Sequence, residues 1–194
     1  MMQMTVTDAD GIEPTQIRGL KRREYDQLAR LGAFEDERVE LLFGAVVTMS
    51  PIDPAHTEST TTLAEILSPQ LLGRARERVQ SSFAASDDSE PEPDILVVPP
   101  DKYWDDHPSR AFLVAEVARS SLRKDRGIKS RLYGSVAVEE YWIVDVDGGG
   151  VHVLRDPDGE GQWRSRQFAR RGEVLRLVAF PDVEVQVSQI LPPV

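Results

Sequence analysis

The chain has 194 residues, of which 40% are hydrophobic, which is enough for one sizeable core and short for two. It contains no cysteine, which excludes disulfides, thiolate metal sites and cysteine nucleophiles. The net charge of −10 disfavours a general affinity for polyanions. The charge is uneven, however, because residues 119–131 carry six basic residues against one acid, while residues 86–94 are strongly acidic.

Neither a membrane anchor nor a secretion signal is expected. No apolar run reaches the roughly 18 residues of a membrane-spanning helix, and the N-terminal residues lack a charged-then-apolar signal pattern. We therefore expect a soluble, cytoplasmic protein. Residues 1–17 are polar and aperiodic and are expected to form a flexible tail, with residues 18–194 forming a single domain without internal repeats.

The N-terminal half predicts two helices around a pair of short strands. Apolar spacing predicts a helix over residues 18–31. Residues 37–49 contain two apolar runs on either side of Gly44, which predicts a strand pair or one kinked strand. Leucines at helical spacing predict a second helix over residues 55–72, and Pro69 is expected to disrupt its last turns.

The central part alternates β-type and helical patterns. Residues 79–85 predict a strand, and the apolar runs 95–98 and 112–117 are typical of strands buried on both faces. A helix over 122–134 and a strand over 139–146 follow, so the order indicates a right-handed parallel crossover. Short β-like runs and the turns DGGG and DPDG then predict antiparallel hairpins. The fold class expected is α/β, with a mixed central sheet flanked by helices.

Two carboxylates accompany the buried strands. Asp94 begins one strand in EPDILVV, and Glu116 lies near the end of the next in FLVAEV. Burying a carboxylate is costly unless it is paired or bound to a cation. Oxygen ligands at adjacent strand ends suit Mg²⁺ or Mn²⁺ better than zinc. The alternatives are a turn cap for Asp94 and a structural ion pair of Glu116 with Arg119 or Lys129.

The order of several short motifs resembles a known family. These are RVELLFGAVVTMSP, PAH, EPDILVV, FLVAEVARSS and DRGIKSRLYGSVAVEEYWIVD, spread over most of the chain. Each motif is weak alone, but their combined order resembles the Uma-type restriction endonucleases, a bacterial family of the PD-(D/E)XK nuclease superfamily. The resemblance implies a restriction endonuclease-like core and a site in which Asp94 and Glu116 bind Mg²⁺ or Mn²⁺, with the Val117 carbonyl and Glu40 as further ligands.

The resemblance also implies where a catalytic lysine lies. The superfamily usually has a lysine two residues after the second acid, where this chain has Ala118. Family members resemble one another in placing a lysine on the following helix, which is matched here by Lys129. Asp125, Lys129 and Tyr133 are spaced i, i+4 and i+8, so one helical face can direct them toward the same cleft. Lys129 is the candidate for stabilising the transition state.

Further candidates border this site. His56 matches a histidine often seen in the family, and the candidate nucleic-acid-binding residues are Arg119, Arg123, Lys124 and Arg126.

Each of these candidates has a simpler alternative. Glu40 is equally compatible with an exposed strand position, and His56 with a solvated loop. Lys129 and Arg131 fit the solvated face of an amphipathic helix. The aromatic residues Tyr133, Tyr141 and Trp142 lie in apolar segments, so they are expected to pack in the core and not to stack on bases. Tyr133 can also border the site.

The functional hypothesis is metal-dependent hydrolysis of DNA, with a homodimer expected by analogy with related nucleases. Two alternatives stay open at the level of sequence. The first is a non-catalytic module of the same fold that binds nucleic acid or protein through residues 119–131. The second is a hydrolase of a small phosphorylated molecule, which the acidic total charge favours. Few elements are left over for base readout, so weak sequence specificity is expected.

Overall fold

The computed structural model describes residues 18–193, so the expected tail at residues 1–17 lies outside the described part of the chain. A six-stranded sheet with the order β3-β4-β5-β6-β7-β8 forms its centre. β5 and β6 are parallel and all other neighbours are antiparallel, which confirms the expected mixed sheet. The strands are β3 (Arg76–Val79), β4 (Ile95–Val98), β5 (Leu113–Ala118), β6 (Glu140–Asp145), β7 (Gly150–Pro157) and β8 (Trp163–Arg170).

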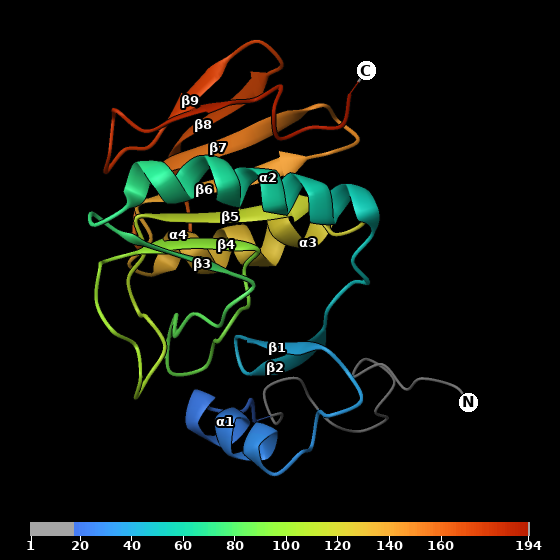
Figure 1. Ribbon diagram of the computed structural model, residues 1–194. Coiled ribbons are helices and arrows are strands. Elements are labelled where there is room, and N and C mark those ends of the chain that lie inside the picture. The colour runs from blue at the N-terminus through green and yellow to red at the C-terminus, as the bar shows by residue number, and fades with distance from the viewer. Residues whose placement is uncertain (1–17, 194) are drawn as a thin grey trace.

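Helices cover both faces of this sheet (Figure 1). α2 (Pro54–Leu71) lies on one face, and a continuous helical segment lies on the other. That segment comprises α3 (Leu122–Lys124), the π-helical turn η3 (Asp125–Lys129) and α4 (Ser130–Ser135). β4, β5 and β6 are buried throughout because both of their faces are covered. Within residues 18–193, none of the helices is both long and apolar enough to cross a membrane.

Smaller elements complete the fold. α1 (Arg22–Arg30) precedes the antiparallel pair β1 (Val39–Leu42) and β2 (Ala45–Thr48), which confirms the strand pair. The turn between these strands needs Gly44, whose φ is +80° and which approaches the backbone of Gly19 so closely that a Cβ would clash. β9 (Val174–Arg176) and β10 (Glu184–Gln186) form the last antiparallel pair, as the C-terminal pattern predicts.

The prediction that Pro69 disrupts the last turns of α2 is wrong. The helix continues to Leu71, although proline has no N–H to donate to the carbonyl of Glu65. Both of these residues are exposed, so water can satisfy that carbonyl. The last turn is stabilised instead by packing, since Leu67 and Leu71 are fully buried against the sheet.

The strand expected at residues 79–85 is also misplaced, because β3 ends where that prediction begins. Val79 pairs with Ile95, and the chain leaves the sheet at Gln80, whose φ is +43°. Gln80 still donates its N–H to the Asp94 carbonyl, but its positive φ turns the chain away from the extended conformation. The ladder therefore stops at this residue.

Glu77 on β3 carries a testable pH dependence. Its Oε1 atom is buried without a hydrogen-bond partner in the described structure, and burial raises the pKa of Glu77 from 4.5 to about 7. The folded protein then retains a proton that the unfolded chain releases above pH 4.5. The free energy of unfolding consequently falls as pH rises from 4.5 to about 7. Above that range this loss of stability, which is the penalty for ionising buried Glu77, is constant.

We expect Glu77→Gln to remove this penalty. Its free energy of unfolding should match the wild type below pH 4.5 and exceed it by about 2 kcal/mol at about pH 8, because one pKa unit corresponds to about 1.4 kcal/mol and partial solvation reduces the full value. Urea denaturation across this pH range measures the difference, with the exposed Glu65→Gln as control. Parallel pH profiles for Glu77→Gln and the wild type would contradict the prediction.

Candidate active site

Asp94 and Glu116 lie at the same end of neighbouring strands. Antiparallel pairing sets Ile95 opposite Ala115, so the residue before β4 lies beside the last residues of β5. The Val117 N–H donates a 2.8 Å hydrogen bond to Asp94 Oδ2. The exposed fractions of Asp94 and Glu116 are only 8% and 4%. The strands therefore hold both carboxylates near each other at the wall of one cavity.

Lys129 reaches this pair from the opposite helix. Its Nζ lies 2.8 Å from Glu116 Oε1 and 3.0 Å from Glu40 Oε2, and its side chain is 2% exposed. Tyr133 OH donates a 2.9 Å hydrogen bond to the same Glu116 oxygen. The solvated-face alternative is thus wrong for Lys129, whereas Arg131 is exposed and lies over the Phe43 ring.

The π-helical turn positions Asp125 beside the same cavity. Asp125 Oδ2 accepts a 2.6 Å hydrogen bond from Ser121, and its Oδ1 is buried without a partner in the described structure. Tyr141 OH donates a 3.2 Å hydrogen bond to the Asp125 carbonyl within the turn. Asp125, Lys129 and Tyr133 are all buried on the inner side of the helical segment, as their spacing predicts. Tyr133 therefore borders the site.

Glu40 on β1 is 1% exposed, so the exposed-strand alternative is wrong. β1 is buried on both sides because Leu41 also pairs with Glu90 beyond the hairpin. Lys124 Nζ lies 2.9 Å from Glu40 Oε1, while Lys129 contacts the other oxygen. Burial raises the pKa of Glu40, but the charges of Lys129 and Lys124 outweigh this and leave the pKa lowered. Glu40 is thus an ionised partner of two lysines.

His56 lies in the first turn of α2 and contacts Asp94. Its Nε2 is 3.0 Å from Asp94 Oδ2, and its side chain is 14% exposed, so the solvated-loop alternative is wrong. Asp53 caps the helix by accepting hydrogen bonds from the backbone N–H groups of Ala55 and His56. Burial lowers the pKa of His56, yet the hydrogen bond and charge of Asp94 outweigh it, and the net pKa is raised.

The cavity between these groups measures about 50 Å³, and its lining contains five carboxyl groups, four fixed cations and His56. Burial raises the pKa of Glu116 well above its usual value, and nearby Asp125 and Asp94 add to the effect against the attraction of Lys129. Burial lowers the pKa of Lys129, but Glu116 and Glu40 raise it above its usual value, so the ammonium stays charged.

A divalent cation fits this set of donors. Among residues 18–193, no group of three or more histidine, aspartate or glutamate side chains is arranged as a metal site. Mg²⁺, however, is commonly held by one or two carboxylates and otherwise by water and substrate phosphate. The features that favour a cation here are the unpartnered Asp125 Oδ1 and the presence of three buried carboxyl groups, Asp94, Glu116 and Asp125, in the lining. Asp94 and Glu116 are the carboxylates positioned to hold it.

The four basic residues expected to bind nucleic acid have different surroundings. Arg119 lines the cavity and is ion-paired with Asp53 at 3.4 Å and Asp147 at 3.2 Å. Lys124 also lines it but is committed to Glu40. Arg123 and Arg126 are exposed on the helical segment. Only the first two therefore belong to the site itself.

Comparisons with known proteins show the family and the fold of this chain. The model of the Uma2 family, described as "Putative restriction endonuclease", matches residues 22–188. The chain belongs to the Uma2 family. A solved structure described as "a putative nuclease belonging to DUF820", from Anabaena variabilis, has a TM-score of 0.70 and 13% sequence identity, covering 88% of this chain and 97% of that one. No curated protein matches the sequence significantly.

The Uma2 assignment and this likeness confirm the restriction endonuclease-like fold, and the family and fold together indicate a nuclease.

Some residues around this cavity were not predicted from the sequence. Ser121 precedes Asp125 by one helical turn, and the Ser-Ser step before the helix was the available signal. Asp53 is recognisable as a helix cap before Pro54. Gln80, whose side-chain amide is 3.5 Å from Asp94 Oδ1, has no signal, because its position depends on where β3 ends. Tyr141 and Trp142 lie in the core, as expected.

Proposed function

We propose that this chain is a metal-dependent endonuclease that hydrolyses phosphodiester bonds of DNA. The observation that carries the proposal is the convergence of Asp94, Glu116 and the Lys129 ammonium on one cavity. Asp94 and Glu116 would hold Mg²⁺ or Mn²⁺, with the Val117 carbonyl and Glu40 as nearby candidates. When bound, such a cation supplies Lewis-acid polarisation of the phosphoryl group and a more acidic water.

The protein's own groups have distinct proposed roles. Lys129 places a permanent positive charge where negative charge develops on the phosphate, on a side chain that is only 2% exposed. Tyr133 and Glu116 fix the direction of that ammonium through the shared oxygen Oε1. His56 and the Val117 N–H fix the carboxylate plane of Asp94. These contacts preorganise the site before substrate arrives.

The lysine position supports this assignment. Ala118 occupies the usual superfamily position and is fully buried at the end of β5. Lys129 comes from the next helical segment but directs its Nζ to the second acid. A lysine contributed by the helix is therefore proposed to replace the one missing from the strand.

Cleavage of supercoiled plasmid and single-stranded DNA with Mg²⁺ or Mn²⁺ tests the proposal. Asp94→Asn should retain the fold but lose activity by on the order of 100-fold, because one ligand charge is removed while an oxygen remains. Glu92→Gln is the matched control, since Glu92 lines the same cavity and pairs with Arg38 at its rim. Its rate should stay within a few-fold of the wild type.

The outcomes separate the alternatives. Equal cleavage by Asp94→Asn and the wild type would overturn the proposal. A folded, metal-supplied wild type that cleaves neither DNA form would do so too and would favour a non-catalytic binding module or, if nucleotides are hydrolysed, a small-molecule hydrolase. The homodimer and the cytoplasmic location remain predictions. Sedimentation equilibrium tests whether the protein is a homodimer.

A further inference from the structure

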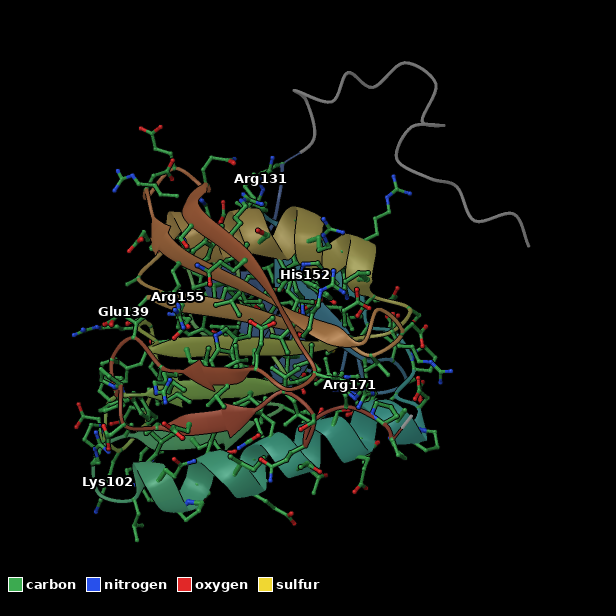
Figure 2. All side chains as sticks on the ribbon, turned by 90° about the horizontal axis from the view of Figure 1, so that it is seen from above. Lys102, Arg131, Glu139, His152, Arg155 and Arg171 are labelled. Carbon is green, nitrogen blue, oxygen red and sulfur yellow. The ribbon has the colours of Figure 1, made fainter. Side chains whose placement is uncertain are left out.

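A second feature lies outside the active site, between the helical segment and strands β7 and β8. Arg126, His152, Arg166 and Gln167 line a hollow of about 140 Å³ there, with Ile143 and Leu154 as its apolar base. We call these six residues the basic groove. Figure 2 shows the helical segment and the two strands side by side, with His152 labelled between them. Trp163 Nε1 also donates a 2.9 Å hydrogen bond to the Ser130 carbonyl, which joins the two elements directly.

The chain has a net charge of −10, but the charge around the basic groove is positive. Arg123 and Arg126 on the helix and Arg166 and Arg170 on β8 lie outside ion-pair distance of every carboxylate in residues 18–193. All four are exposed.

Two aromatic rings accompany these charges, one in the lining of the groove and one beside it. The rings of His152 and Phe168 lie 4.7 Å apart between their centroids, on neighbouring strands in register. The guanidinium of Arg170 lies 5.4 Å from the Phe168 ring. Burial and then the charge of Arg126 lower the pKa of His152, so the positive charge of the groove comes from the arginines. Positive grooves with aromatic surfaces are the usual design for binding one strand of nucleic acid.

The basic groove begins beside the active site. Lys124 lines the catalytic cavity and Arg126 lines the groove, and because residues two apart point to opposite sides of a helix, the two sites flank the start of the helical segment. His152 Nε2 lies 3.5 Å from Asp145, which pairs with Ala118 at the end of β5, immediately beyond Glu116 and Val117. A strand seated at the catalytic carboxylates can therefore reach the groove by passing the ends of β5 and β6.

We propose that the basic groove binds the phosphate backbone of the substrate strand on one side of the cleavage site. Arg126 and Arg166 contact phosphates from the helix and from β8, and Arg123 and Arg170 extend the track at its ends. This inference rests on the proposed function only in taking nucleic acid as the ligand. It accounts for how an acidic protein can bind a polyanion, because the charge that matters is local.

Binding of a fluorescein-labelled single-stranded DNA 20-mer, followed by anisotropy in EDTA over a range of salt concentrations, tests the groove without cleavage. The double variant Arg126→Gln/Arg166→Gln should bind about 10-fold more weakly, and the slope of log K against log salt should fall by about 1.4, since each lost contact contributes about 0.7. Arg76→Gln is the control, because Arg76 is an exposed arginine on β3, the opposite edge of the sheet.

An unchanged affinity and salt slope in the double variant would overturn the inference, as would a wild type that does not bind the 20-mer. The plasmid assay separates this failure from that of the proposed function. If cleavage depends on Asp94 but the groove variants bind DNA normally, only the proposal for the groove is contradicted. If binding depends on the groove arginines but cleavage does not depend on Asp94, the groove proposal is supported and the proposed metal site is contradicted.

Discussion

Replacing Lys129 with methionine is expected to lower the free energy of unfolding by about 3–5 kcal/mol, because breaking a buried ion pair leaves uncompensated charge. Glu116 and Glu40 both rely on the Lys129 ammonium, at 2.8 Å and 3.0 Å, and the lysine side chain is 2% exposed. Under conditions where the variant is still folded, cleavage should fall by on the order of 1000-fold, because among residues 18–193 Lys129 is the one cation within ion-pair distance of Glu116.

A double-mutant cycle separates these two effects. The double variant Glu40→Gln/Lys129→Met lacks one of the two carboxylates that lose their cation in Lys129→Met. Its loss of stability should therefore be smaller than the sum of the losses in the two single variants, while its cleavage rate should remain low. Lys124→Met is the matched control, since Lys124 also contacts Glu40 but its side chain is 21% exposed. Urea denaturation measures stability. A Lys129→Met protein as stable as the wild type would show that the buried pair contributes nothing.

Replacing Glu116 with glutamine should also abolish activity, but unlike Lys129→Met it should keep stability, because Lys129 retains Glu40 as an ion-pair partner at 3.0 Å. Burial raises the pKa of Glu116 well above its usual value, and Asp125, Asp94 and Glu40 repel its charge. The isosteric amide removes that charge, so the metal-free protein should be at least as stable as the wild type. Cleavage should fall by on the order of 1000-fold, because a charged ligand and the partner of Lys129 are lost together.

Thermal unfolding with and without Mn²⁺ gives a readout besides activity. The wild type should be stabilised by Mn²⁺, because a ligand that binds only the folded state stabilises it, and Glu116→Gln should lose most of this shift. Tyr133→Phe is the control, since it removes only the 2.9 Å hydrogen bond to Glu116 Oε1. If Glu116 is instead a structural ion-pair partner of Lys129, Glu116→Gln will be clearly destabilised and its response to Mn²⁺ unchanged.

Much of the fold could be predicted because burial imposes a pattern on the sequence. The runs 95–98 and 139–146 are apolar because their strands are covered on both faces, and they are found as β4 and β6. Gly44 marks the β1–β2 turn because that turn needs a positive φ. Such signals are local, so one sequence is sufficient to detect them.

The errors occurred where a distant partner decides the structure. The strand expected at 79–85 fails because Gln80 turns the chain out of the sheet beside Asp94, and α2 passes Pro69 because the sheet holds Leu67 and Leu71. In the same way, Glu40 and Lys129 each fit a solvated position by local pattern. Their burial follows from the meeting of β1 with the helical segment, which no local spacing encodes.

The π-helical turn at Asp125–Lys129 has a consequence for how this site tolerates change. Successive residues of an α-helix are separated by about 100° around its axis, because one turn takes 3.6 residues. A π turn accommodates one additional residue. It therefore determines the angle around the helix axis between the side chain of Lys124, before the turn, and that of Tyr133, after it. Gly127 lies within this turn and is exposed, and a Cβ added to it would meet no atom within 4 Å. Loss of one residue here would keep a regular helix yet rotate its two ends relative to each other, so helicity alone does not preserve the alignment of the lysines with their carboxylates.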